Sequence, residues 1–273
     1  MILKKHNSSK KPTKKEHKKQ AWKTVLIAFL LLVWVAAVVI VAQLIVGYLM
    51  LWILGKDNFS RPVPMAIYSA LSYILAFVCI LYTTPKFIIN KKNKTKKLQI
   101  ISKNMSRNDL GLREWPTWTD IGLAPVGFII SLLLAAILVG IFSSFSWFDA
   151  EQTQEIGFST YLIGFDRVIA FITLVLVAPV AEELIFRGWL YGKLRPMLSE
   201  KLSDRASMII SILLVSLLFG TIHMQWNVGV NVFALSIVLC GLREITGTIY
   251  SGILVHILKN GIAFYMLYVI GIR

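Results

Sequence analysis

Two long stretches without any charged residue limit what this chain can fold into. Residues 24–55 and 206–242 contain no Lys, Arg, Asp or Glu and are strongly apolar. A helix needs about 20 residues to cross the hydrocarbon core of a bilayer, and lipid offers no partners to an open backbone. The chain is therefore predicted to be an all-α, polytopic transmembrane helical bundle. With 56% hydrophobic and only 16% charged residues, its composition is not that of a soluble enzyme.

The number of spans follows from the remaining apolar runs. These runs are 65–84, 121–148, 168–192 and 245–272. The stretch 206–242 is long enough for two helices joined by a turn at 225–229. We therefore expect about seven spans, with six to eight possible.

The charges lie at the ends of these spans. With seven spans, one side of the membrane receives the segments 1–23, 86–120, 193–206 and 243–244, which together carry +16, and the other side carries −1. The positive-inside rule then predicts a cytoplasmic N-terminus. Because the basic residues do not form a groove or stripe, no nucleic-acid partner is expected. The expected partner is the lipid bilayer.

Three regions are expected along the chain. Residues 1–23 form a basic cytoplasmic tail, expected to be disordered. Residues 24–165 hold N-terminal transmembrane helices with a basic cytoplasmic loop at 86–120, and residues 166–273 hold a core of polar-containing spans. Cys79 and Cys240 both lie in apolar runs, so small core residues are expected rather than a disulfide or a metal pair.

A first group of ionisable residues lies inside a predicted span, where charges are costly and usually functional. Glu183 and Arg187 are four residues apart, share a helix face and are expected to pair. Glu182 is rotated by about 100° from Glu183, which leaves it available for other work. Pro179 can kink the helix and free a backbone carbonyl. A buried bridge that only locks two helices together is the structural alternative.

Two further groups repeat the spacing of four. Phe219 and His223 share one face, and His256 and Asn260 share another. Taken singly, each has a structural alternative, such as an interfacial histidine or a hydrogen bond between helices. Lys259 lies on a different face from His256 and receives no chemical role.

Together the three groups contain the parts for hydrolysis by water. A carboxylate can take a proton from water, a histidine can orient it, and His or Asn donors can stabilise an oxyanion. No cofactor is expected. Zinc remains possible, with Glu182, His223 and His256 as ligands, although the His-Glu-x-x-His spacing is absent.

The ordered motifs resemble the CAAX protease and bacteriocin-processing family, the Abi group that includes type II CAAX prenyl endopeptidases. The similarity rests on Glu-Glu-x-x-x-Arg at 182–187, Phe-x-x-x-His at 219–223 and His-x-x-x-Asn at 256–260, and it covers roughly 168–270. It implies an intramembrane endopeptidase of glutamate type with a cavity open to the cytoplasm.

The resemblance also implies roles for individual residues. Glu182 would be the base that activates water, aided by His223, and His256 with Asn260 would form the oxyanion site. Glu183 would be a supporting carboxylate held by Arg187. The substrate would be a membrane-associated peptide or protein, and bacterial relatives are linked to bacteriocin maturation and self-immunity. The short lysine-rich chain is typical of a multi-pass protein of a bacterial plasma membrane.

Two other classes of protein fit the same residues. A non-catalytic membrane scaffold or immunity protein would bind a partner through its spans, and Glu182→Gln would then keep its activity. A proton-coupled transporter would also use buried Glu and His, but the sequence lacks the paired interrupted helices of repeat-built transporters.

Overall fold

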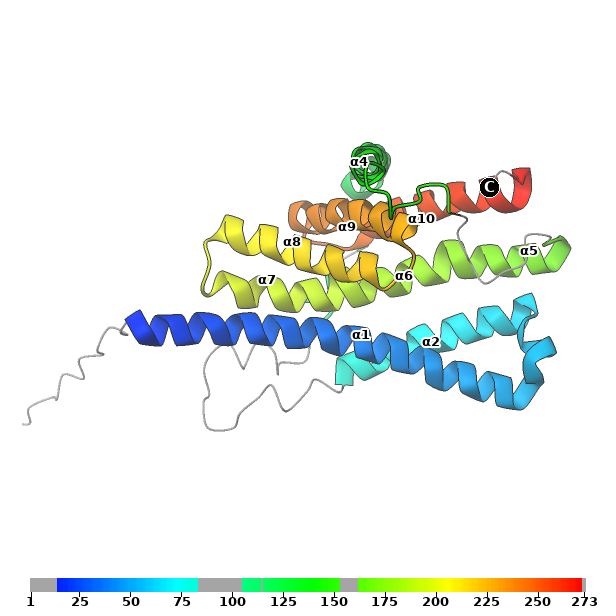
Figure 1. Ribbon diagram of the computed structural model, residues 1–273, viewed down its shortest axis with the longest axis horizontal. Coiled ribbons are helices and arrows are strands. Elements are labelled where there is room, and N and C mark those ends of the chain that lie inside the picture. The colour runs from blue at the N-terminus through cyan, green and yellow to red at the C-terminus, as the bar shows by residue number, and fades with distance from the viewer. Residues whose placement is uncertain (1–13, 83–104, 114, 153–161, 272–273) are drawn as a thin grey trace, which may run out of the picture.

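The protein is a bundle of helices in the computed structural model, which describes residues 14–82, 105–113, 115–152 and 162–271 (Figure 1). The predicted tail therefore falls largely, and the basic loop partly, outside the described residues. No strand occurs within these ranges. Seven helices in them are long and apolar enough to cross a membrane, which confirms the expected fold class and number of spans. The chain is a multi-pass membrane protein.

The first two helices form an antiparallel pair. Helix α1 (Lys14–Phe59) runs the length of the molecule, and α2 (Pro62–Tyr82) returns beside it (Figure 1). Gly55 adopts a positive φ of 71° near the end of α1, which kinks the helix there. Small buried residues on α2, among them Ala66, Ser72 and Ala76, recur at helical spacing, which allows close packing of helices in a membrane.

The fourth span is one long interrupted helix. It comprises α5 (Gly164–Phe171), a π-helical segment η2 (Ile172–Val177), α6 (Ala178–Glu183), a second π-helical segment η3 (Leu184–Tyr191) and α7 (Gly192–Ser199). The short α6 carries both adjacent glutamates at its end. The end of α7 lies at the same side of the molecule as the start of α1 (Figure 1), in agreement with the predicted grouping of 1–23 and 193–206.

The last three long helices complete the core. They are α8 (Asp204–Thr221), α9 (Trp226–Thr246) and α10 (Tyr250–Tyr265), which continues as the π-helical segment η4 (Met266–Ile270). The turn between α8 and α9 lies at 222–225, slightly earlier than the predicted 225–229. Gly247 ends α9 in the left-handed conformation with φ 70°.

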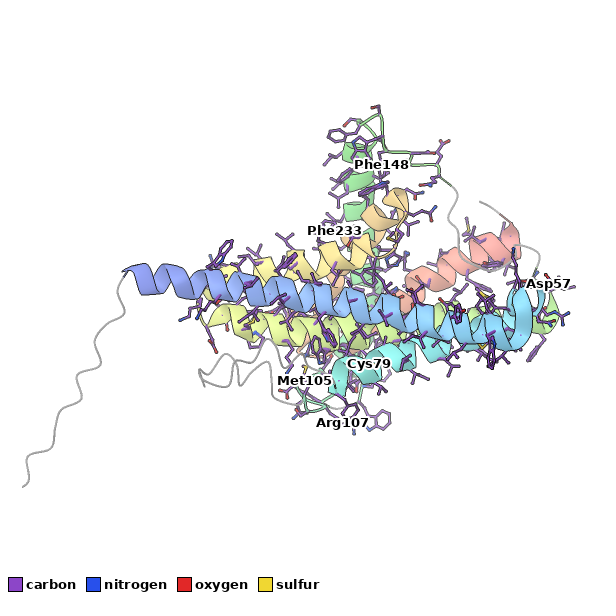
Figure 2. The ribbon with its side chains drawn as sticks, turned by 60° about the horizontal axis from the view of Figure 1, so that its bottom comes forward. Asp57, Cys79, Met105, Arg107, Phe148 and Phe233 are labelled. Atoms are coloured by element: carbon purple, nitrogen blue, oxygen red, sulfur yellow. The ribbon has the colours of Figure 1, made fainter. Side chains whose placement is uncertain are left out.

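Helix α4 (Trp118–Phe142) crosses the others. It is seen end-on in Figure 1 and stands across α1 in Figure 2, and it packs on α9 and α10. Asp120 lies in the first turn of α4 and is only 2% exposed. Its carboxylate accepts hydrogen bonds from Thr248 Oγ1 at 2.9 Å and Ser251 Oγ at 2.7 Å. The start of α4 is thereby held at the start of α10.

Candidate functional site

The predicted pair between Glu183 and Arg187 is present and fully buried. Arg187 Nη1 donates to Glu183 Oε1 at 2.8 Å, and the two side chains are 1% and 0% exposed. Two charges are tolerated at such depth only because each neutralises the other. The pair therefore has a structural contribution, and its carboxylate is unavailable as a free base.

Phe219 is the centre about which the polar groups are arranged. Its ring packs edge-to-face against His223 at 5.0 Å and His256 at 5.9 Å between ring centroids. The guanidinium carbon of Arg187 lies 4.5 Å from the ring centroid on its face, a favourable cation–π geometry. The buried phenyl ring thus sets the relative position of two histidines and an arginine that come from three different helical segments.

His256 connects the two glutamates. Its Nδ1 lies 3.1 Å from Glu183 Oε1, and its Nε2 lies 3.7 Å from Glu182 Oε2. The contact to Glu183 fixes the orientation of the ring, as a hydrogen-bond partner on one imidazole nitrogen does. Nε2 is consequently turned toward Glu182, at a distance just beyond a direct hydrogen bond.

Glu182 has a different environment from its neighbour. Its side chain is 14% exposed and accepts a hydrogen bond from the Tyr73 hydroxyl at 2.5 Å through Oε1. The partner comes from α2, more than one hundred residues earlier in the chain. Glu182 also interacts electrostatically with His223 and Lys259. The adjacent carboxylates are therefore separated as predicted, one paired with arginine and one directed at uncharged donors and histidines.

His223 lies in the turn after α8 with one ring nitrogen committed. Nδ1 is 2.7 Å from the carbonyl oxygen of Phe219, and a carbonyl can only accept, so Nδ1 carries a proton. Burial lowers the pKa of His223 below its ordinary value, although the carboxylate of Glu182 acts in the opposite direction. In the neutral ring Nε2 is then an unprotonated acceptor, as a residue that orients water requires.

Asn260 has a contact that follows from Pro179. The backbone N–H of Ala178 donates to Thr173 O, five residues earlier, and the next bond in this register would join residue 179 to Leu174. Proline has no N–H, so the Leu174 carbonyl needs another donor, and Asn260 Nδ2 supplies it at 2.9 Å. The freed carbonyl predicted from Pro179 is thus identified, and the second N–H of Asn260 remains for other partners.

The zinc alternative receives no geometric support in the described part of the chain. No three His, Cys, Asp or Glu side chains there are grouped so that they could hold a metal ion. The predicted independence from metal remains a prediction. Neither cysteine forms a disulfide in the described part of the chain, and Cys240 is buried whereas Cys79 is partly buried.

These contacts define a class of protein: a helical membrane protein with an acid–base cluster enclosed among its spans. Residues 163–262 match the family described as type II CAAX prenyl endopeptidase Rce1-like. This part of the chain is therefore similar to the Rce1-like family, which confirms the predicted resemblance. No curated protein and no solved structure matches the chain.

The matched residues contain every predicted site residue but omit one that the structure adds. Tyr73 lies outside 163–262, and its sequence context, an uncharged apolar run, gave no signal that distinguishes it from a lipid-facing tyrosine. No chemical role is predicted for Lys259 from the sequence, yet it interacts electrostatically with Glu182. Its position close to His256 in the last span is the sequence feature that could have indicated this contact.

Proposed function

We propose that the protein is an intramembrane endopeptidase that hydrolyses peptide bonds of a membrane-associated peptide or protein with water activated by Glu182. The observation that carries the proposal is the separation of the two glutamates. Glu183 is neutralised by Arg187 at 2.8 Å, whereas Glu182 has an oxygen 3.7 Å from His256 Nε2 and interacts electrostatically with His223. A carboxylate in this setting can accept a proton from water.

The other residues then complete the reaction. His223, neutral with a free Nε2, accepts a hydrogen bond from the water and orients it toward the scissile carbonyl. His256 Nε2, when protonated, and the second N–H of Asn260 donate to the developing oxyanion, which is the largest electrostatic contribution in acyl-transfer reactions. The proton held by Glu182 passes to the leaving amine as the tetrahedral intermediate collapses, so the carboxylate is restored.

The substrate class follows from the family. Relatives described as type II CAAX prenyl endopeptidases suggest a substrate whose C-terminal end is anchored at the membrane, and we extend this to membrane peptides in general. Processing of a bacteriocin or another peptide, or self-immunity in a bacterial plasma membrane, is the cellular role that we propose. Neighbouring genes that encode such peptides would support it.

Cleavage of quenched fluorescent peptides by the purified protein tests the activity. The peptides are offered with and without a C-terminal prenyl-cysteine, and wild type is compared with Glu182→Gln and His223→Gln. Glu200, exposed at the end of α7, provides the matched control Glu200→Gln. We expect both site variants to lose cleavage and the control to keep it. Undiminished cleavage by both site variants would contradict the mechanism, and a biological activity that survives Glu182→Gln without any cleavage would indicate a binding scaffold.

A further inference from the structure

A second polar pocket lies outside the cluster just described. It has a volume of about 440 Å³ and is lined by the segment before α4, by α7 and by the end of α9. Arg113, Arg195 and Arg243 all face it, together with Asp109 and Glu244. The contacts of these five side chains show whether the positive charges of the pocket are compensated by its own carboxylates.

The positive charge of Arg195 is compensated by two carboxylates. Its guanidinium donates to Glu244 Oε1 at 2.8 Å, to Asp204 Oδ1 at 2.6 Å and to Ser207 Oγ at 2.7 Å. Glu244 is used a second time, by the Tyr191 hydroxyl at 2.5 Å. These groups form a closed network around Arg195. The carboxylates of Glu244 and Asp109 also attract Arg243 electrostatically, but no ion pair joins it to either of them among the described residues.

Arg243 is held in place by backbone carbonyls instead of a carboxylate. It donates to the carbonyl oxygens of Gly247 and Asp109, the latter at 3.0 Å. Its guanidinium also lies against Gly111, where an added Cβ would come within 2.6 Å of Cζ. The cation is therefore fixed at the wall of the pocket, and only glycine at position 111 leaves room for it.

Arg113 brings a second cation to the same place. A Cβ on Gly247 would lie 3.8 Å from Arg113 Cζ, so both guanidiniums gather around this one residue, and they repel each other. Neither makes an ion pair with any residue in the ranges that the structure covers. The carboxylate of Asp109 accepts from Ser106 N and Oγ at 2.9 and 2.8 Å. Two repelling cations held beside an open pocket are the arrangement that an anion would stabilise.

The pocket is placed where lipid headgroups are found. Arg113 is exposed and is followed by Trp115 and Trp118, whose side chains are 89% and 87% exposed immediately before and at the start of α4. Tryptophans at the end of a span are typical of the membrane–water interface. The pocket residues at 108–113, 195–196 and 243–244 belong to segments that the charge distribution assigns to the positive side of the membrane.

We propose that Arg113 and Arg243 form a binding site for the phosphodiester of an anionic phospholipid headgroup. A guanidinium offers parallel N–H donors that match two phosphate oxygens, and a net negative headgroup neutralises the pair. The site is independent of the proposed proteolysis, since none of its residues contacts the glutamates or histidines described above.

The test uses the full chain, purified in a neutral detergent and titrated separately with phosphatidylglycerol, phosphatidylcholine and inorganic phosphate. Bound lipid is followed by native mass spectrometry and stabilisation by the melting temperature. The variant is Arg113→Gln, because this exposed side chain can be changed without disturbing the core. The control is Arg107→Gln, which removes an exposed arginine of the same segment that points away from the helices and does not line the pocket (Figure 2).

We expect phosphatidylglycerol to bind more tightly than phosphatidylcholine and Arg113→Gln to weaken it about fivefold, as the loss of one cation near a membrane surface does. Arg107→Gln should leave the affinity unchanged. Equal weakening by both variants would show diffuse surface charge, and no weakening by Arg113→Gln or equal affinity for both lipids would also overturn the site. Stabilisation by inorganic phosphate that matches that of phosphatidylglycerol would assign the pocket to a free anion and refute the lipid.

Discussion

The hydrogen bond between Tyr73 and Glu182 makes a sharp prediction for Tyr73→Phe. The substitution removes only the hydroxyl that lies 2.5 Å from Glu182 Oε1, and it keeps the ring that packs between α2 and α6. This donor is a hydrogen bond to a charged group, and it holds one oxygen of the carboxylate in place. Without it, the proposed base is less well positioned to take a proton from water.

The magnitude follows from the strength of the bond. A hydrogen bond to a charged group contributes about 1.5–3 kcal/mol, and about 1.36 kcal/mol corresponds to a factor of ten in rate. Loss of this donor from the proposed base should therefore lower kcat/KM by about tenfold to a hundredfold.

The assay is kcat/KM of peptide cleavage, with the melting temperature measured on the same preparations. Tyr82 on the same helix is exposed, so Tyr82→Phe is the matched control and should keep the activity of the wild type. A loss of activity accompanied by a large fall in melting temperature would assign Tyr73 a packing role only. An unchanged kcat/KM for Tyr73→Phe, with Glu182→Gln inactive, would refute the contribution of the hydrogen bond but leave Glu182 as the base.

Three further predictions address the rest of the site. Arg187→Leu leaves Glu183 as a buried charge without its cation and should destabilise the fold by about 3–5 kcal/mol, seen as a lower melting temperature than that of exposed Arg205→Leu. The pKa of His223 is lowered from 6.5 in the folded protein. Its contribution to the free energy of unfolding is therefore complete above pH 6.5 and is lost as the pH falls below that value. The melting temperature of His223→Gln should accordingly fall less on acidification than that of the wild type. Chelation of metal should leave cleavage unchanged, and one equivalent of bound zinc would contradict the glutamate mechanism.

The spans could be predicted from the sequence because their determinant is local. An apolar run long enough to cross a bilayer must satisfy its backbone as a helix, and the six runs form the seven helices that were expected. The ends were less well predicted. The fourth span, expected at 168–192, occupies Gly164–Ser199, since Lys193 and Arg195 are buried or bound to carboxylates and do not stop the helix. The course of α4 across the other helices depends on tertiary contacts, such as those of Asp120, which no local pattern contains.

The site was predictable to the extent that helical spacing determines it. The contact between Glu183 and Arg187 follows from their separation by four residues, and the stacking of Phe219 with His223 has the same origin. The π-helical segments on either side of α6 were not predictable. Each adds a residue to a turn, so it changes which side chains face which neighbour. The Leu174 carbonyl is available to Asn260 because Pro179, just after η2, has no N–H to bind it.

The use of two adjacent glutamates for different tasks requires partners from both halves of the chain. Residues about 100° apart on a helix face different neighbours. Glu183 contacts Arg187 and His256, which belong to the part that matches the Rce1-like family. Glu182 contacts Tyr73 on α2, which lies outside that part. The N-terminal helices are therefore expected to set the reactivity of Glu182, and residues 163–271 expressed alone should lose cleavage even where they insert into the membrane.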